Sequence, residues 1–212
     1  METILIVAKT RMANGVCVGG INESTCELIR LHDEKGRNLS ADAPYEVGDR
    51  WSIWGMEKAW NCREKPHVED KQVPFFNRNK IGNVGIQGII DFINTHDFGK
   101  QLIKGSLDET FEGCLNLTGQ SGFINRDKIP SFSTQFWIVD RDLQHTSTDT
   151  NKHYYIYNNI KIPFVGFQSL IDKIPAGTIV RISLANWWQK EEGAEERCYL
   201  QLSGWYISML PA

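Results

Sequence analysis

Short β-like segments separated by turn residues fill the C-terminal third of the chain, and their order restricts the fold more than any other feature. Asn158-Asn159 joins two of them, and asparagine tolerates the positive φ of a tight hairpin. Alternating or continuous apolar residues bounded by turn residues are typical of strands. Five strands are expected, at residues 134–142, 154–157, 160–164, 178–185 and 197–206.

Between the third and fourth of these strands the sequence predicts a short helix. Phe167, Leu170, Ile171 and Ile174 fall on one helical face, and Pro175 ends the segment. Three strands, a helix and two strands follow the order of an OB-fold, a small Greek-key β-barrel. An SH3-like barrel and an unrelated β-sandwich stay open as alternatives.

The N-terminal half repeats this pattern less regularly. Strands are predicted at residues 3–9, 15–21, 25–32 and near 50–58, with a fifth at Val73–Phe76 or later. A helix is predicted within residues 86–99, because four isoleucines recur at helical spacing and Gly99 follows as a stop. We therefore expect a mainly β fold of two OB-like barrels, residues 1–77 and 131–212, joined by a helical connection over residues 78–130.

Charge and cysteine content restrict the class of protein. A net charge of −3 argues against a protein that coats nucleic acid by bulk charge, although a local basic groove stays compatible with it. The five cysteines are scattered without CxxC spacing, which favours a reducing, cytoplasmic setting. The apolar run at the N-terminus is too short for a signal peptide, and no membrane span is expected.

The stretch AKTRMANGVCVGG (residues 8–20) matches neither a Gly-x4-Gly-Lys-Ser/Thr phosphate loop nor a dinucleotide fingerprint. Its glycines are expected to serve backbone geometry: Asn14-Gly15 in a hairpin turn and Gly19-Gly20 in a bulge or barrel corner. Three polar side chains stand where the first strand leaves the barrel, and their donors suit phosphate oxygens. These residues are Lys9, Thr10 and Arg11.

The stretch KQVPFFNRNK (residues 71–80) interleaves aromatic and basic residues. Rings that stack on bases and cations that follow phosphates are typical of a surface that binds single strands. The alternative is a pair of core phenylalanines followed by a basic loop. The candidate nucleic-acid residues here are Phe75, Phe76, Arg78 and Lys80, with Trp54 as a further stacking ring.

Two further segments carry candidate sites. In PHVED, the side chains of His67 and Glu69 project to one face of an extended segment, and with Asp70 they could hold a divalent metal or perform acid–base chemistry. The alternative is a solvated loop.

Trp187 and Trp188 end a strand before a turn with four glutamates, which favours a protein contact over a phosphate contact.

The N-terminal block LIVAKTRM…GVCVGG, together with IRLHDEKG, YEVGDRW and PHVED, resembles the dual OB-containing domain proteins of prokaryotes. The resemblance spans essentially the whole chain. It implies two OB-folds and a role in binding, with nucleic acid as the expected partner and a defence or mobile-element setting. It supplies no catalytic residues.

The sequence therefore predicts a module without enzymatic activity or cofactor that binds single-stranded DNA or RNA. One alternative is a metal-dependent hydrolase or nuclease that uses His67, Glu69 and Asp70 with Lys9 or Arg11. The other is a protein-interaction adaptor that uses Trp187 and Trp188. The sequence does not rank DNA against RNA or name a protein partner.

Overall fold

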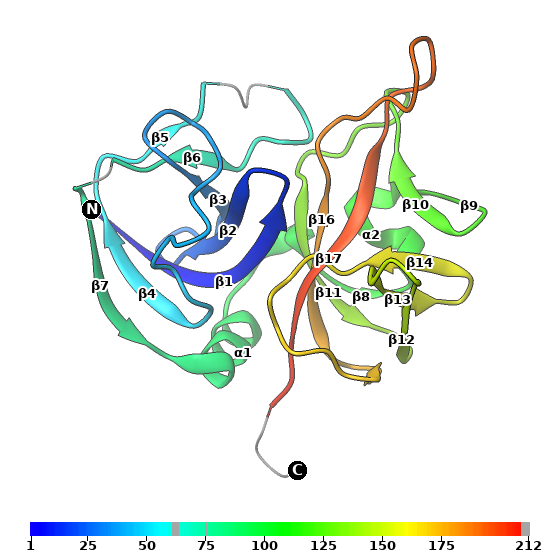
Figure 1. The fold of residues 1–212 in the computed structure, drawn as a ribbon. Helices are drawn as coiled ribbons and strands as arrows, with labels where there is room; N and C mark the ends of the chain where they lie inside the picture. The colour runs from blue at the N-terminus through cyan, green and yellow to red at the C-terminus, as the bar shows by residue number, and fades with distance from the viewer. Residues whose placement is uncertain (61–63, 75, 209–212) are drawn as a thin grey trace. The chain divides into compact units, whose positions relative to one another are not determined.

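A computed structural model describes residues 1–60, 64–74 and 76–208 of the 212-residue chain. The chain divides into two compact units, and β-strands dominate both of them (Figure 1). The N-terminal unit comprises Met1–Glu64, Glu69–Gly99 and Tyr206–Ala212. The C-terminal unit comprises Lys65–Val68 and Lys100–Trp205.

The N-terminal unit contains a sheet in the order β5-β6-β3-β2-β1-β4-β7. Strands β1, β2 and β3 form an antiparallel meander, β4 pairs antiparallel with β1, and β6 runs parallel to β3. Strands β4 and β5 lie near opposite ends of this order, but only residues 54–56 separate them, so the sheet curls into a barrel with OB-fold strand order. Strand β7 is added beside β4. The strands are β1 Glu2–Met12, β2 Gly15–Asn22, β3 Leu28–His32, β4 Asp49–Ile53, β5 Glu57–Lys58, β6 Asp70–Gln72 and β7 Arg78–Asn83.

A bulge in β1 curves this barrel. The register of β1 against β2 shifts between Ile6 and Ala8, opposite Gly20 and Gly19, so the bulge expected around these glycines is present. A Cβ on Gly20 would lie 2.5 Å from Cγ2 of Ile4, which packs in the core of the barrel. Glycine here therefore lets β2 approach the core side chains of β1 closely.

The one long helix of the described chain is α1, Gly85–Thr95, and it confirms the helix predicted around residues 86–99. Ile89 and Ile93 are fully buried, as the helical spacing requires. The helix ends at Thr95, before Gly99. Residues 78–130 also contain β7 and strands of the C-terminal unit, so this segment is mixed in structure, and the domain boundaries drawn there stay a prediction.

The C-terminal unit contains two sheets, in the orders β8-β11-β16-β17-β10-β9 and β14-β13-β12-β15. Between β8 and β9 lie the 3-10 helix η2, Leu107–Glu109, and the short helix α2, Thr110–Gly113; the 3-10 helix η1, Gly99–Gln101, precedes β8. The strands are β8 Leu102–Gly105, β9 Asn116–Thr118, β10 Ser121–Ile124, β11 Thr134–Val139, β12 Leu143–Ser147, β13 His153–Tyr157, β14 Ile160–Pro163, β15 Lys173–Ile174, β16 Ile179–Leu184 and β17 Cys198–Tyr206.

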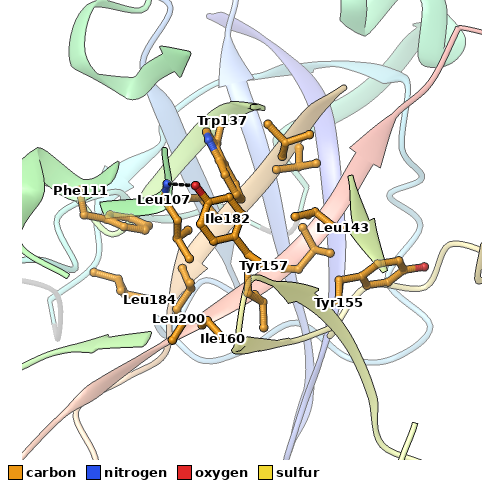
Figure 2. Close-up of a cluster of buried hydrophobic side chains, with 14 of the residues drawn as sticks. Leu107, Phe111, Trp137, Leu143, Tyr155, Tyr157, Ile160, Ile182, Leu184 and Leu200 are labelled. Carbon is orange, nitrogen blue, oxygen red and sulfur yellow. Dashed lines mark hydrogen bonds between the residues drawn. The ribbon is translucent and has the colours of Figure 1, made fainter. Parts of the chain in front are cut away.

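These two sheets join into a second barrel with OB-fold strand order. Strands β11 and β12 follow each other across residues 140–142, and β16 pairs antiparallel with β11. The predicted hairpin at Asn158-Asn159 joins β13 to β14, and Asn158 has the expected positive φ of 54°. The chain then runs parallel to β17, where Phe164 bridges to Leu202. Inside, Trp137, Tyr157 and their aliphatic neighbours form one core (Figure 2).

The helix predicted from Phe167 to Ile174 is wrong. This segment is irregular and ends in β15. Its polar groups bond to the barrel instead of to each other: the Gln168 amide bonds to the backbone N–H and carbonyl of Trp205, and the Ile171 carbonyl accepts from the Tyr155 hydroxyl at 2.8 Å. A helix this short has little stability of its own, so these tertiary bonds decide the conformation.

Gly15 offers a test of the N-terminal hairpin. Its φ is +103°, and a Cβ there would lie 2.1 Å from the Leu39 carbonyl oxygen. Gly15→Ala should therefore lower the free energy of unfolding by about 1–3 kcal/mol, measured by chemical denaturation. Gly82→Ala is the matched control, because Gly82 has open space around it and no positive φ. Equal stability of the two variants would contradict the assignment of strain to Gly15.

Candidate binding surfaces

In the N-terminal unit, Lys9 is already engaged by the loop before β4. Its Nζ donates to the Ala43 carbonyl and to Oε1 of Glu46, each at 3.0 Å. The Lys9 side chain is only 12% exposed, whereas that of Glu46 is 68% exposed. Lys9 therefore closes a loop over the barrel and presents little of its charge to a ligand.

The two predicted cations of β7 contact the same loop. Arg78 donates to the Tyr45 hydroxyl at 2.9 Å, and its guanidinium lies 5.2 Å from the centroid of that ring. Lys80 Nζ lies 2.6 Å from Oδ1 of Asp49. Lys9, Arg78 and Lys80, predicted from separate stretches of sequence, thus converge on the segment 43–49.

Asp49 is the buried anion of this arrangement. It is fully buried, and burial alone would raise the pKa of its carboxyl. Hydrogen bonds from the Lys80 ammonium, the Asn83 amide and the Glu46 backbone N–H outweigh that effect and hold the pKa below its usual range. The carboxylate therefore fixes the turn that leads into β4.

Thr10 and Arg11 differ in accessibility. Thr10 is buried, and its hydroxyl lies 3.4 Å from the Cys17 carbonyl across the β1–β2 pair. Arg11 is exposed near the end of β1. Within the Lys9-Thr10-Arg11 group, Arg11 is the residue best placed to meet a ligand.

Exposed aromatic rings gather beside β7. Trp54 is 37% exposed and Phe76 is 87% exposed, and the Trp54 backbone N–H donates to the Asn77 carbonyl at 3.1 Å. The segments that carry these two rings are therefore neighbours. Phe75 lies outside the described residues. Trp60, which no sequence motif marks, is 64% exposed and donates from Nε1 to the Lys35 carbonyl.

The three candidate residues of PHVED have different partners in the structure. His67 belongs to the C-terminal unit, where its Nε2 lies 3.7 Å from the buried Sγ of Cys198, a partner that its sequence neighbourhood gives no reason to expect. Glu69 and Asp70 belong to the N-terminal unit. The Glu69 carbonyl accepts the backbone N–H of Arg30, so this residue serves the pairing of β6 with β3.

The Asp70 carboxylate is part of a buried cluster. Arg30 Nε donates to one of its oxygens, and His32 Nε2 lies 3.1 Å from the other. All three residues are buried. Across residues 1–60, 64–74 and 76–208, no three His, Cys, Asp or Glu side chains gather in a way that could hold a metal ion. The Asp70 cluster therefore has the composition of a structural ion pair, not that of a metal site.

Trp187 and Trp188 have different surroundings in the loop between β16 and β17. Trp187 packs partly against the core, with the Arg126 guanidinium 3.8 Å from its ring centroid. Trp188 is 52% exposed, and its ring centroid lies 6.0 Å from that of Tyr199. Trp188 therefore offers an accessible ring.

Two glutamates of this loop are paired with arginines. Arg197 donates to Glu195 at 2.7 Å, and Arg126 donates to Glu196 at 2.9 Å. These pairs are partly exposed, so each contributes little to stability. They lower the negative charge that the sequence alone attributes to the turn.

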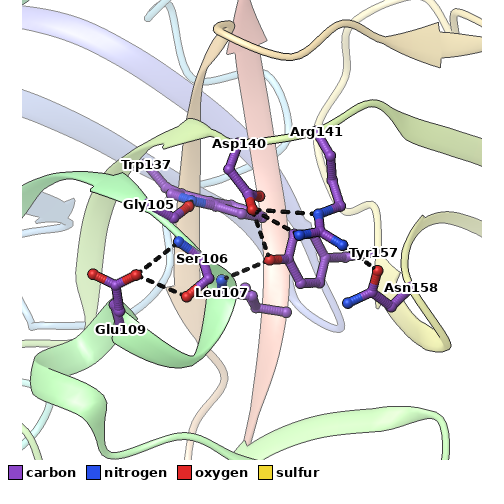
Figure 3. A network of polar contacts seen from close by, with 9 residues as sticks. All are labelled: Gly105, Ser106, Leu107, Glu109, Trp137, Asp140, Arg141, Tyr157 and Asn158. Atoms are coloured by element: carbon purple, nitrogen blue, oxygen red, sulfur yellow. Dashed lines mark hydrogen bonds and ion pairs between the residues drawn. The ribbon is translucent and has the colours of Figure 1, made fainter.

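A polar network around Tyr157 joins three segments of the C-terminal unit (Figure 3). The Tyr157 hydroxyl donates to Asp140 at 3.2 Å and accepts the Leu107 backbone N–H at 3.3 Å, while the Arg141 guanidinium lies 4.8 Å from its ring centroid. Burial raises the pKa of the Tyr157 phenol, which keeps the hydroxyl protonated as a donor. The network anchors the capping box at Ser106 and serves structure.

Both barrels have the strand order of an OB-fold, a fold whose strands and loops commonly hold ligands, so the chain is an OB-fold binding module. The sequence model of the dual OB-containing domain matches residues 2–205, and the chain belongs to that family. A comparison with curated proteins found no match. None of the helices in the described ranges is long and apolar enough to cross a membrane.

Asp49→Asn tests the role of the buried carboxylate. The asparagine amide keeps one acceptor oxygen, but its NH₂ group replaces the second oxygen and faces groups that are themselves hydrogen-bond donors. The free energy of unfolding should therefore fall by about 1–3 kcal/mol at neutral pH. Because the folded pKa lies below the ordinary value of 3.8, the wild-type advantage is present above that value and is lost as the pH falls through the folded pKa. Denaturant titrations at neutral and acidic pH measure both effects.

Glu46→Gln is the control for this variant, since Glu46 lies in the same loop but is largely exposed. Its effect should stay below about 1 kcal/mol. If the stability difference between wild type and Asp49→Asn stays constant from neutral to acidic pH, the ionised carboxylate is not what stabilises the loop.

Proposed function

We propose that the chain binds single-stranded DNA or RNA, with the rings of Trp54 and Phe76 as the stacking surface. The observation that carries this proposal is the exposure of both rings on neighbouring segments of the N-terminal barrel. Bases stack on such rings with little sequence preference, because every base has a flat face. The proposal extends to the prokaryotic defence or mobile-element setting that the family resemblance implies.

Cations of the N-terminal barrel support the same proposal. Arg78 begins β7, an edge strand whose side chains are largely exposed, and Arg11 is exposed at the end of β1. Lys9 and Lys80 have partners within the protein, so they contribute to phosphate binding less than the sequence predicts. Arg78, opposite Ile53 and so next to the Trp54 segment, is the proposed phosphate contact beside the rings, and the exposed Arg11 is a second one at the far end of β1.

The two alternative functions have unequal support. A hydrolase based on His67, Glu69 and Asp70 needs a carboxylate that is available to a substrate or metal, and Asp70 is held by Arg30 and His32. A protein contact is favoured by one observation, the 52% exposure of Trp188. It can coexist with nucleic-acid binding.

Fluorescence anisotropy with labelled single strands of about 12 nucleotides, a length one OB-fold can cover, tests the proposal. Each stacked base contributes about 1–3 kcal/mol, so the double variant Trp54→Ala, Phe76→Ala should bind at least about tenfold more weakly than wild type. Trp188→Ala is the matched control, an exposed ring of the C-terminal unit, and should bind like wild type.

Binding should also weaken as salt is added, because bound phosphates release counterions. The proposal is wrong if wild-type protein binds neither DNA nor RNA strands at low ionic strength. It is equally wrong if the double variant binds as tightly as the control.

A further inference from the structure

Two histidines face each other on neighbouring strands of the C-terminal barrel. Strands β12 and β13 are neighbours (Figure 1). His145 on β12 lies opposite Tyr155, and His153 on β13 lies opposite Ser147, so the two histidines are diagonal neighbours on one face of the pair. Nε2 of His145 and Nδ1 of His153 are 3.2 Å apart. The ring centroids are 5.3 Å apart. No motif in the sequence marks either residue, because eight positions separate them along the chain.

Backbone bonds from outside the hairpin hold both histidines. The His145 N–H donates to the Asp172 carbonyl, and the His153 carbonyl accepts the Phe164 N–H, each at 2.9 Å. The Tyr155 ring centroid lies 5.4 Å from that of His145. Side chains carried on strands fixed in this way keep their geometry better than side chains on loops.

We propose that His145 and His153 form a binding site for a borderline divalent metal ion of the zinc type. Imidazole nitrogens bind zinc at about 2.0–2.1 Å, so two of them on one tetrahedral ion are separated by about 3.3 Å. The observed separation of 3.2 Å already matches this spacing. Imidazole is a preferred ligand of Zn²⁺, Ni²⁺ and Cu²⁺, whereas Mg²⁺ and Ca²⁺ prefer oxygen.

A metal ion at about 2.0–2.1 Å from both facing nitrogens lies to one side of the line that joins them, where it binds a lone pair of each ring. In the metal-free pair one facing nitrogen carries a hydrogen and the other accepts it. The donor ring binds metal after it takes its other neutral tautomer, which moves that hydrogen to its far nitrogen and leaves both facing lone pairs available. The ring charges stay unchanged, so the exchange balances without a co-reactant.

Two imidazoles leave further coordination positions. No group of three His, Cys, Asp or Glu suited to a metal occurs within residues 1–60, 64–74 and 76–208, so water or an external ligand completes the coordination. Structural zinc sites use four protein ligands. This site therefore holds its ion in exchange with solution, and it is independent of the nucleic-acid surface proposed for the N-terminal unit.

Calorimetric titration of tag-free, chelator-treated protein with Zn²⁺ tests the proposal. Wild-type protein should bind one ion at this site, and His145→Ala and His153→Ala should each weaken binding at least about tenfold, because the second imidazole acts at a high effective concentration. His96→Ala is the control, since His96 lies in the N-terminal unit stacked on Phe92. It should bind like wild type.

Imidazole ¹⁵N resonances of the wild-type protein provide a test that needs no variant. The chain has five histidines. The resonances of His145 and His153 should shift together at substoichiometric Zn²⁺, before those of the other three. The proposal is overturned if these two resonances do not respond first, or if the His145→Ala, His153→Ala and control proteins bind Zn²⁺ equally well.

Discussion

The N-terminal barrel closes where β3 and β6 run parallel, and a buried ion pair holds that closure in place. Strand β6 has only three residues, and the Glu69 carbonyl adds one backbone bond to Arg30. A strand of three residues gains little stability from its few backbone hydrogen bonds to β3. Breaking a buried ion pair by removing one partner costs about 3–5 kcal/mol. Asp70 opposite Arg30, with His32 beside it, therefore fixes both register and direction. The acidic end of PHVED has this structural task.

Charge pairing also orders the loop between β3 and β4 of this barrel. Lys9 from β1 and the two cations of β7 reach the segment 43–49 from different strands, and Asp49 is its buried anion. In the C-terminal barrel, hydrogen bonds from the Tyr155 hydroxyl and the Gln168 amide hold the segment before β15, and Lys173 of β15 pairs with Asp142. Neither connection contains the helix common in OB-folds, because side chains of the barrel satisfy its polar groups.

Local patterns in the sequence predict most strands, helix α1 and the Asn158-Asn159 hairpin, because burial of one face leaves a periodic trace in each. Three features depended on distant residues and were missed. The segment Phe167–Ile174 has helical spacing but bonds to β13 and β17. The fifth strand of the first barrel lies at Asp70–Gln72, where three polar residues leave no apolar pattern. Lys9 meets a loop that lies 34 residues away, and no spacing rule connects the two.

These pairings alter what the proposed nucleic-acid surface can do. A lysine that is 12% exposed and held by Glu46, and another bound to a buried carboxylate, have little charge to offer a phosphate. Arg78 lies next to the ring-bearing segment and Arg11 is exposed at the end of β1, and single strands lose about 0.7 units of log K per log unit of salt for each phosphate neutralised. The electrostatic share of the affinity is then small, in keeping with the net charge of −3. Stacking on Trp54 and Phe76 has to supply the larger part of the binding free energy. Such a surface accepts many nucleotide sequences but loses affinity when one ring is removed.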